Sequence, residues 1–145
     1  MKAGATQWIV GAAVLLLAGA CGGSSNEAVE ASARRAEREV ISLAQQSSAL
    51  VEVSRVSYAC DSSDAAGGSI VADADGSATA ADILERLKVG AASSGWAPGQ
   101  DGDALVLRKT IDGRDFFVVA PGSGSEVEPG SDRLLIAWNM DRKGC

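Results

Sequence analysis

The chain of 145 residues contains no histidine, and only 4% of its residues are aromatic. Without histidine, the catalytic triads that depend on an imidazole base are excluded, and only carboxylate, lysine or tyrosine chemistry remains. The sequence also lacks the GxSxG, GxGxxG and P-loop patterns. We therefore expect the protein not to be an enzyme, with no catalytic residues and no cofactor.

Basic residues are scarce relative to acidic ones, with 13 Lys and Arg against 19 Asp and Glu and a net charge of −6. Nucleic acid is a polyanion that such a chain would repel, so we expect no nucleic-acid partner. The length suffices for one modest hydrophobic core and is too small for two. We expect a single domain that is a monomer.

The longest apolar run lies near the start of the chain, at residues 8–18 (WIVGAAVLLLA), shortly after Lys2. It has the length of the apolar region of a secretory signal peptide, whereas a transmembrane helix needs about 20 apolar residues. The polar residues 22–26 (GGSSN) then stand where a stop-transfer segment would carry charge. We expect residues 1–20 to be a cleaved signal peptide rather than a permanent helical anchor.

Small residues stand immediately before Cys21, namely Ala18, Gly19 and Ala20. This pattern resembles the lipobox of bacterial lipoproteins. The resemblance implies that the thiol of Cys21 receives a diacylglyceryl group, that the chain is cut before it, and that the new amino terminus is acylated, for example with palmitate. Two or more acyl chains hold a protein stably at a bilayer, because each buried methylene contributes about 0.8 kcal/mol.

The lipobox divides the chain into three parts. Residues 1–20 are the lipoprotein signal peptide, residues 21–30 are the lipidated cysteine and a flexible tether, and residues 31–145 are a single domain. The domain would then lie on the extracytoplasmic face of the plasma membrane. The alternative is ordinary secretory cleavage, which leaves Cys21 as a mature N-terminal thiol.

The remaining cysteines, Cys60 and Cys145, form an even pair in a compartment that permits disulfides. We expect them to be bonded. Such a long closed loop stabilises the folded state by on the order of 4 to 5 kcal/mol in the chain-entropy model. A two-thiol metal site or a redox pair is the alternative, but the sequence has no CxxC motif and no histidine. We expect no metal site.

Two helices are predicted. In residues 27–50 apolar side chains recur at helical spacing, but only the second half is strongly apolar. We expect the first half to continue the exposed tether and the second half to pack on the domain, with a coiled-coil seam for a partner helix as the alternative. The second helix is expected at residues 80–94, with Thr79 as N-cap and Gly95 beyond its end. Charges alternate in sign along the side of the first helix that we expect to face solvent: Arg34, Arg35, Glu37, Arg38 and Glu39.

Strands are predicted where apolar and polar residues alternate. Val56, Tyr58 and Cys60 recur at every second position, with polar Ser57 between the first two, and residues 69–73 and 133–140 are further candidates. Between the second helix and the later strands, residues 98–103 contain turn-forming residues and are read as a turn.

The clearest strand signal is a hairpin over residues 104–121. Asp112 and Gly113 suit a two-residue turn, because both of its central positions need a positive φ. This register predicts one strongly apolar face directed at the helices. The other face mixes apolar and polar residues and is the candidate surface for a partner; it includes Val106, Arg108, Phe117 and Val119.

The order of elements predicts an α+β fold, an antiparallel sheet of four or five strands with two helices on one face. This order, with a strand ending in a cysteine, a helix ending in Gly-Trp and a terminal cysteine, resembles small envelope lipoproteins of actinobacteria. The resemblance implies the location and the architecture, and it implies no activity.

One group of acidic residues partly matches a calcium-binding loop. Asp73, Asp75 and Gly76 match three positions of an EF-hand loop, and Asp82 falls at its end. Val71 occupies the first position, where the loop needs a carboxylate. We therefore interpret the segment as a turn between a strand and a helix.

The sequence favours a non-catalytic binding or structural protein of the cell envelope, attached to the membrane through lipidated Cys21 and in contact with other envelope proteins. The alternative is an accessory carrier of a small apolar ligand, or an enzyme that uses carboxylates. A closed core favours the first class, and a large internal cavity favours the second.

Overall fold

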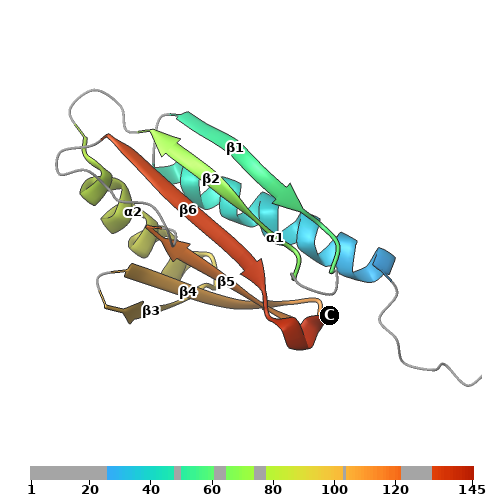
Figure 1. Ribbon diagram of the computed structural model, residues 1–145. Helices are drawn as coiled ribbons and strands as arrows, with labels where there is room; N and C mark the ends of the chain where they lie inside the picture. Colours follow the sequence, from blue (N-terminus) through green and yellow to red (C-terminus); the bar gives the residue numbers. More distant parts are fainter. Residues whose placement is uncertain (1–25, 48–49, 61–64, 74–77, 103, 122–131) are drawn as a thin grey trace, which may run out of the picture.

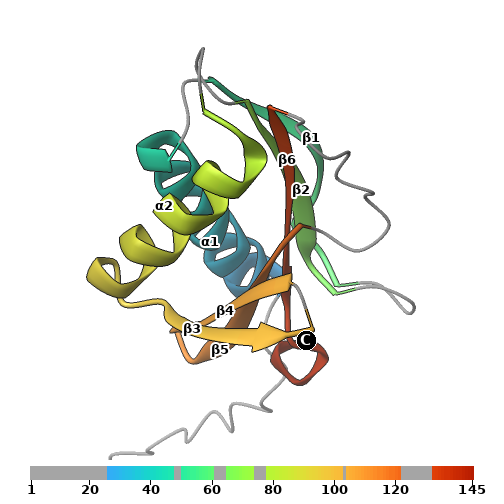
Figure 2. The ribbon, with the colours of Figure 1, turned by 90° about the vertical axis from the view of Figure 1, so that its left-hand side faces the viewer.

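The computed structural model of the chain describes residues 26–47, 50–60, 65–73, 78–102, 104–121 and 132–145. These residues form two layers, a six-stranded antiparallel sheet and two α-helices that lie on one of its faces (Figures 1 and 2). The α+β class is confirmed. The elements in chain order are α1 (Asn26–Ser47), β1 (Leu50–Ser57), β2 (Gly67–Asp73), α2 (Ala80–Ser93), β3 (Ala97–Asp101), β4 (Ala104–Ile111), β5 (Arg114–Ala120), β6 (Arg133–Met140) and the 3-10 turn η1 (Arg142–Gly144).

The strands are ordered β1-β2-β6-β5-β4-β3 across the sheet. The sixth strand, which the sequence did not predict, is β3, formed by the segment that we read as a turn. Conversely, β1 ends at Ser57, so Tyr58 and Cys60 follow the strand instead of belonging to it. No helix in the described ranges is long and apolar enough to cross a membrane.

Both edge strands carry features that hinder pairing with another chain. In β1 the register shifts between Val53 and Arg55, and such an irregularity twists an edge. At the opposite edge, β3 is only five residues long and contains Pro98, which has no N–H to donate.

The hairpin of β4 and β5 forms as predicted. Asp112 and Gly113 have φ values of 51° and 77°, the positive values that a two-residue turn requires. Ile111 lies opposite Arg114 and Leu107 opposite Val118, so the predicted register is confirmed. The side chains of Leu105, Leu107, Ile111, Phe116 and Val118 are accordingly buried.

Local signals also fix both ends of α2. The Thr79 side chain accepts a hydrogen bond from the Asp82 N–H, and the Asp82 carboxylate accepts one from the Thr79 N–H, which completes a capping box. At the other end Gly95 has φ 77°, and the N–H of Trp96 donates to the Ala91 carbonyl at 3.0 Å. This Schellman-type ending turns Trp96 into the core.

The first half of α1 is packed, and the expectation that it continues an exposed tether is wrong. Val29, Ala33 and Ala36 are at most 2% exposed. Alanine is a weak sequence signal of burial, yet its small side chain lets a helix approach its neighbours closely. The helix also begins at Asn26, within the range 21–30 that the sequence assigned to the tether.

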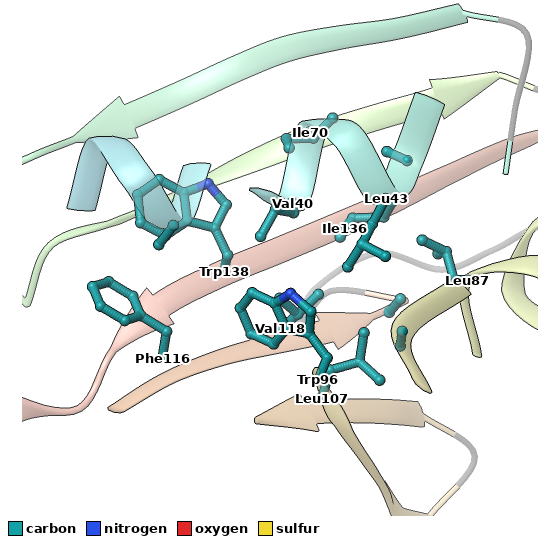
Figure 3. Close-up of a cluster of buried hydrophobic side chains, with 14 of the residues drawn as sticks. Val40, Leu43, Ile70, Leu87, Trp96, Leu107, Phe116, Val118, Ile136 and Trp138 are labelled. Atoms are coloured by element: carbon teal, nitrogen blue, oxygen red, sulfur yellow. The ribbon is translucent and has the colours of Figure 1, made fainter. Parts of the chain in front are cut away.

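The core lies between the sheet and the two helices (Figure 3). Trp96, Trp138 and Phe116 are its largest side chains, and the rings of Phe116 and Trp138 lie 6.4 Å apart between centroids. Val40 and Leu43 of α1 face this group. The buried indole N–H groups of both tryptophans have no acceptor among the described residues.

Candidate interaction face

The two cysteines predicted to pair are bonded. Cys60 and Cys145 form a disulfide with a Cα–Cα distance of 5.8 Å across a sequence separation of 85 residues. Cys145 is exposed and Cys60 is partly buried against the core. The bond ties the C-terminal turn η1 to the segment after β1, so its role in the fold is structural.

The other sequence-predicted positions are only partly described. Cys21 lies outside the described residues, as do Asp75 and Gly76 of the calcium-loop pattern. Asp73 is engaged in an ion pair with Arg133 at 2.7 Å, and Asp82 caps α2. The hydrogen bonds from Thr79 to Asp82 lower the pKa of this carboxyl. The structure thus assigns Asp73 and Asp82 to other contacts.

A buried carboxylate joins α1 to the segment after β1. The hydroxyl of Tyr58 donates a 2.6 Å hydrogen bond to Oε2 of Glu37, whose side chain is buried. The guanidinium of Arg34 lies 4.0 Å from the centroid of the Tyr58 ring and also pairs with Glu30. The expectation that Glu37 lies on the solvated side of the helix is wrong, because Tyr58 covers that position.

A second polar contact joins α1, α2 and β4. Nζ of Lys109 lies 2.6 Å from Oε2 of Glu39 and donates to the carbonyl of Ser94 at 2.8 Å. The same ammonium lies 5.9 Å from the Trp96 ring. A cation at this carbonyl interacts favourably with the C-terminal end of α2. The contact is structural, and it holds both helices on the sheet.

The face of the sheet turned away from the helices carries a continuous apolar surface. Because side chains alternate between the two faces of a strand, the residues next to the buried ones point outward. The cross-strand register places Val71 beside Leu135, Ala137 beside Val119, and Val119 beside Val106. We call this surface the outer strip; all of its side chains are partly exposed, and it comprises Val71, Val106, Phe117, Val119, Leu135 and Ala137.

Arg108 lies on the same face, next to Phe117 of the outer strip, and has no acidic partner among the described residues. Its guanidinium stacks 4.7 Å from the centroid of the Phe117 ring, its cross-strand neighbour. Among the other charged residues of this face, Asp115 accepts a hydrogen bond from Thr110 and Asp73 binds Arg133. Glu52 of β1 lies opposite Val71 and is exposed. An arginine stacked on an aromatic ring within an apolar surface has the composition of a protein interaction site.

A groove of about 390 Å³ lies on the helix side of the domain. It is open to solvent and is lined by Gln46 of α1 and by Glu85, Arg86, Val89 and Gly90 of α2. Val89 is 74% exposed, which is high for a large apolar residue. The groove is a surface feature of the helix layer, distinct from an enclosed cavity of the kind that a lipid carrier needs.

The described part of the chain contains no group of three acidic or cysteine side chains arranged to hold a metal ion. Comparisons of the sequence and structure with protein-family models, with curated proteins and with solved structures found no match.

Sequence reasoning identified four residues of this face, Val106, Arg108, Phe117 and Val119, because the hairpin register could be derived from one turn. It missed Val71, Leu135 and Ala137, which come from β2 and β6. The alternation of apolar and polar residues within each strand indicated that these three side chains share a face. Their place beside the hairpin could not be derived, because β6 pairs with β2 and β5 through contacts between residues distant in sequence.

Proposed function

We propose that the protein is a non-catalytic lipoprotein of the cell envelope, anchored through Cys21 at the extracytoplasmic face of the plasma membrane, that binds another envelope protein through the outer strip. The lipobox residues support the anchor. The disulfide between Cys60 and Cys145 supports an oxidising compartment. The likeness to small actinobacterial envelope lipoproteins agrees with both.

The observation that carries the binding role is Arg108, which has no acidic partner within the described part of the chain and is stacked on Phe117 within an apolar surface. A partner that covers the strip must remove this guanidinium from water, which is unfavourable unless an acidic group meets it. We therefore propose a protein partner that presents apolar side chains and a carboxylate opposite Arg108. Nearby Phe117 supplies the largest apolar contact of the strip.

Crosslinking in intact cells tests this role. A photo-crosslinking amino acid at Val119 should give a defined protein adduct, and the same group at Val89, on α2, should not give that adduct. The variants Phe117→Asp and Arg108→Glu should abolish the adduct, because each removes a complementary group. Their controls, Val89→Asp and Lys88→Glu, introduce the same acidic residues on the exposed surface of α2 and should leave the adduct intact.

Each variant must first show the unfolding temperature of the wild type, so that a lost adduct reports the surface and not misfolding. An adduct that survives both Phe117→Asp and Arg108→Glu contradicts the outer strip as the binding face. Substrate turnover by the purified domain contradicts the non-catalytic class.

The anchor is tested separately. Cys21→Ala should leave an unprocessed precursor or release the protein from the membrane. Mass spectrometry of the mature protein from native membranes should show the acyl groups on Cys21, and an unmodified Cys21 there contradicts the lipoprotein assignment.

A further inference from the structure

The two ends of the described chain lie at the same end of the molecule. Figures 1 and 2 show the start of α1 and the turn η1 close together, beside the β4–β5 turn. Arg114 joins them, because its guanidinium donates to the carbonyl of Gly144 at 3.2 Å and to the hydroxyl of Ser32 at 3.3 Å. Arg35 pairs with Asp112 of the hairpin turn at 3.0 Å. We call this region the anchor end.

The chain between Cys21 and the domain is short. Only residues 22–25 separate Cys21 from Asn26, where α1 begins. Even fully extended, five residue steps span only about 17 Å. A lipid attached to Cys21 therefore keeps the start of α1 near the bilayer surface.

The helix cannot swing away from the sheet to relax this constraint. Val29 and Ala33, in its first two turns, are buried against the core at 2% and 0% exposure. Since α1 has 22 residues, it extends for about 33 Å, and Figure 1 shows it running alongside β1, β2 and β6. Gln46 and the groove lie at its far end.

The sides of α1 do not suit contact with a bilayer. An interfacial helix buries an apolar face in the lipid, but the apolar face of α1 is buried against the sheet. Its exposed residues include the ion pair of Arg34 and Glu30. At the anchor end, by contrast, η1 carries the exposed basic residue Lys143, which anionic headgroups would attract, and the carboxylate of Asp141 caps this turn.

We propose that the anchor end faces the bilayer to which Cys21 is attached, with η1 at the level of the lipid headgroups. This proposal rests on the lipidation of Cys21. The strands then run away from the membrane surface, the outer strip faces sideways along it, and the groove at Gln46 and Val89 lies at the end of α1 that is remote from the lipid. A protein that binds the outer strip would accordingly lie beside the domain, along the membrane surface.

Fluorescence quenching in vesicles tests this orientation. The full chain, with acylated Cys21 verified by mass spectrometry, is reconstituted into phosphatidylethanolamine and phosphatidylglycerol vesicles that contain a nitroxide-labelled headgroup lipid. An environment-insensitive fluorescent amino acid replaces Lys143, Lys88 or Val119 in three separate proteins. We expect quenching several-fold stronger at position 143 than at position 88, with position 119 between them.

The outcomes separate the orientation from the function that it rests on. If the fluorophore at 88 is quenched as strongly as that at 143, the domain has no fixed orientation and the proposal fails. If position 119 is quenched most, the outer strip lies on the bilayer, which also overturns it. A chain without acyl groups on Cys21 refutes the lipoprotein assignment itself, and that result is read from the mass spectrum before any quenching.

Discussion

Tyr58 and Glu37 are joined by a 2.6 Å hydrogen bond from the phenol to a buried carboxylate. This hydrogen bond holds the segment that leads to Cys60 against α1. The hydrogen bond is the largest cause of the raised pKa of Tyr58. Partial burial and the negative charge of Glu37 raise this pKa further, and the positive charge of Arg34 lowers it. The neutral phenol is therefore the form that the folded state favours.

The first prediction concerns the titration of Tyr58, the only tyrosine in the chain. In the unfolded chain a tyrosine titrates near pH 10. Because the folded-state pKa is higher, the contribution of Tyr58 to stability is fully present below about pH 10 and is lost as the pH rises through the folded pKa. The tyrosinate absorbance of the folded protein should therefore appear at higher pH than in denaturant.

Two variants sharpen this titration. Glu37→Gln removes the charged acceptor and should move the tyrosinate transition back toward the unfolded value. Glu30→Gln, on the exposed side of the same helix, should change it much less, because Glu30 has the smallest influence on the pKa of Tyr58. Identical transitions in folded and unfolded wild-type protein contradict the hydrogen bond.

The second prediction concerns the disulfide. Cys60→Ser should lower the free energy of unfolding by on the order of 4 kcal/mol, because the unfolded chain regains the freedom of a long loop. Cys145→Ser should have the same effect, and the double variant should be no worse than either single one. Thermal and urea unfolding measure the change, and unreduced wild-type protein should show no free thiol at either position. If Cys60→Ser and Cys145→Ser change the free energy of unfolding by different amounts, one of the two cysteines stabilises the fold in another way besides the disulfide.

The third prediction concerns the polar contact beneath the helices. In a double-mutant cycle, Lys109→Met and Glu39→Gln should show a coupling on the order of 1 kcal/mol, because both side chains are largely withdrawn from solvent. The exposed pair of Arg34 and Glu30 is the matched control, with an expected coupling of about 0.3–0.5 kcal/mol. Urea unfolding gives both values, and equal couplings would show that burial adds nothing to the Lys109 contact.

The fourth prediction concerns the close approach of β2 and β6. A Cβ on Gly67 would lie 2.6 Å from the carbonyl oxygen of Trp138, a backbone atom that cannot move aside alone. Gly67→Ala should therefore destabilise the domain by about 1–3 kcal/mol. Gly99→Ala, on edge strand β3, meets nothing closer than 3.6 Å and should change the unfolding temperature little. A tolerated Gly67→Ala contradicts this strand spacing.

The features that could be predicted from the sequence are those with local causes. Thr79, Gly95 and the Asp112-Gly113 turn act through backbone geometry within a few residues, so their structures follow from residue type. The pairing of Cys60 with Cys145 followed from their even number and from the oxidising compartment that residues 1–20 predict. Arg108 beside Phe117 followed from the hairpin register alone.

What could not be predicted depends on packing between distant segments. The strand β3 contains Pro98 and Gly99, which disfavour strands, and it forms because β4 offers an edge. Glu37 is buried because Tyr58, from the segment after β1, reaches it. The outer strip was predicted only in part, since β6 contributes Leu135 and Ala137 through its central position.

The position of β6 has a consequence for how the domain folds. It follows every other strand in the chain, yet it lies between β2 and β5 and is the link between the hairpin of β1 and β2 and the three strands β3, β4 and β5. The two groups of strands cannot form one sheet before β6 pairs with both. We therefore expect the pairing of β6, which joins residues distant in sequence, to be the rate-limiting step of folding. Chains that lack β6 would hold two separate half-sheets with open edges, and a chain shortened before Arg133 would keep them apart.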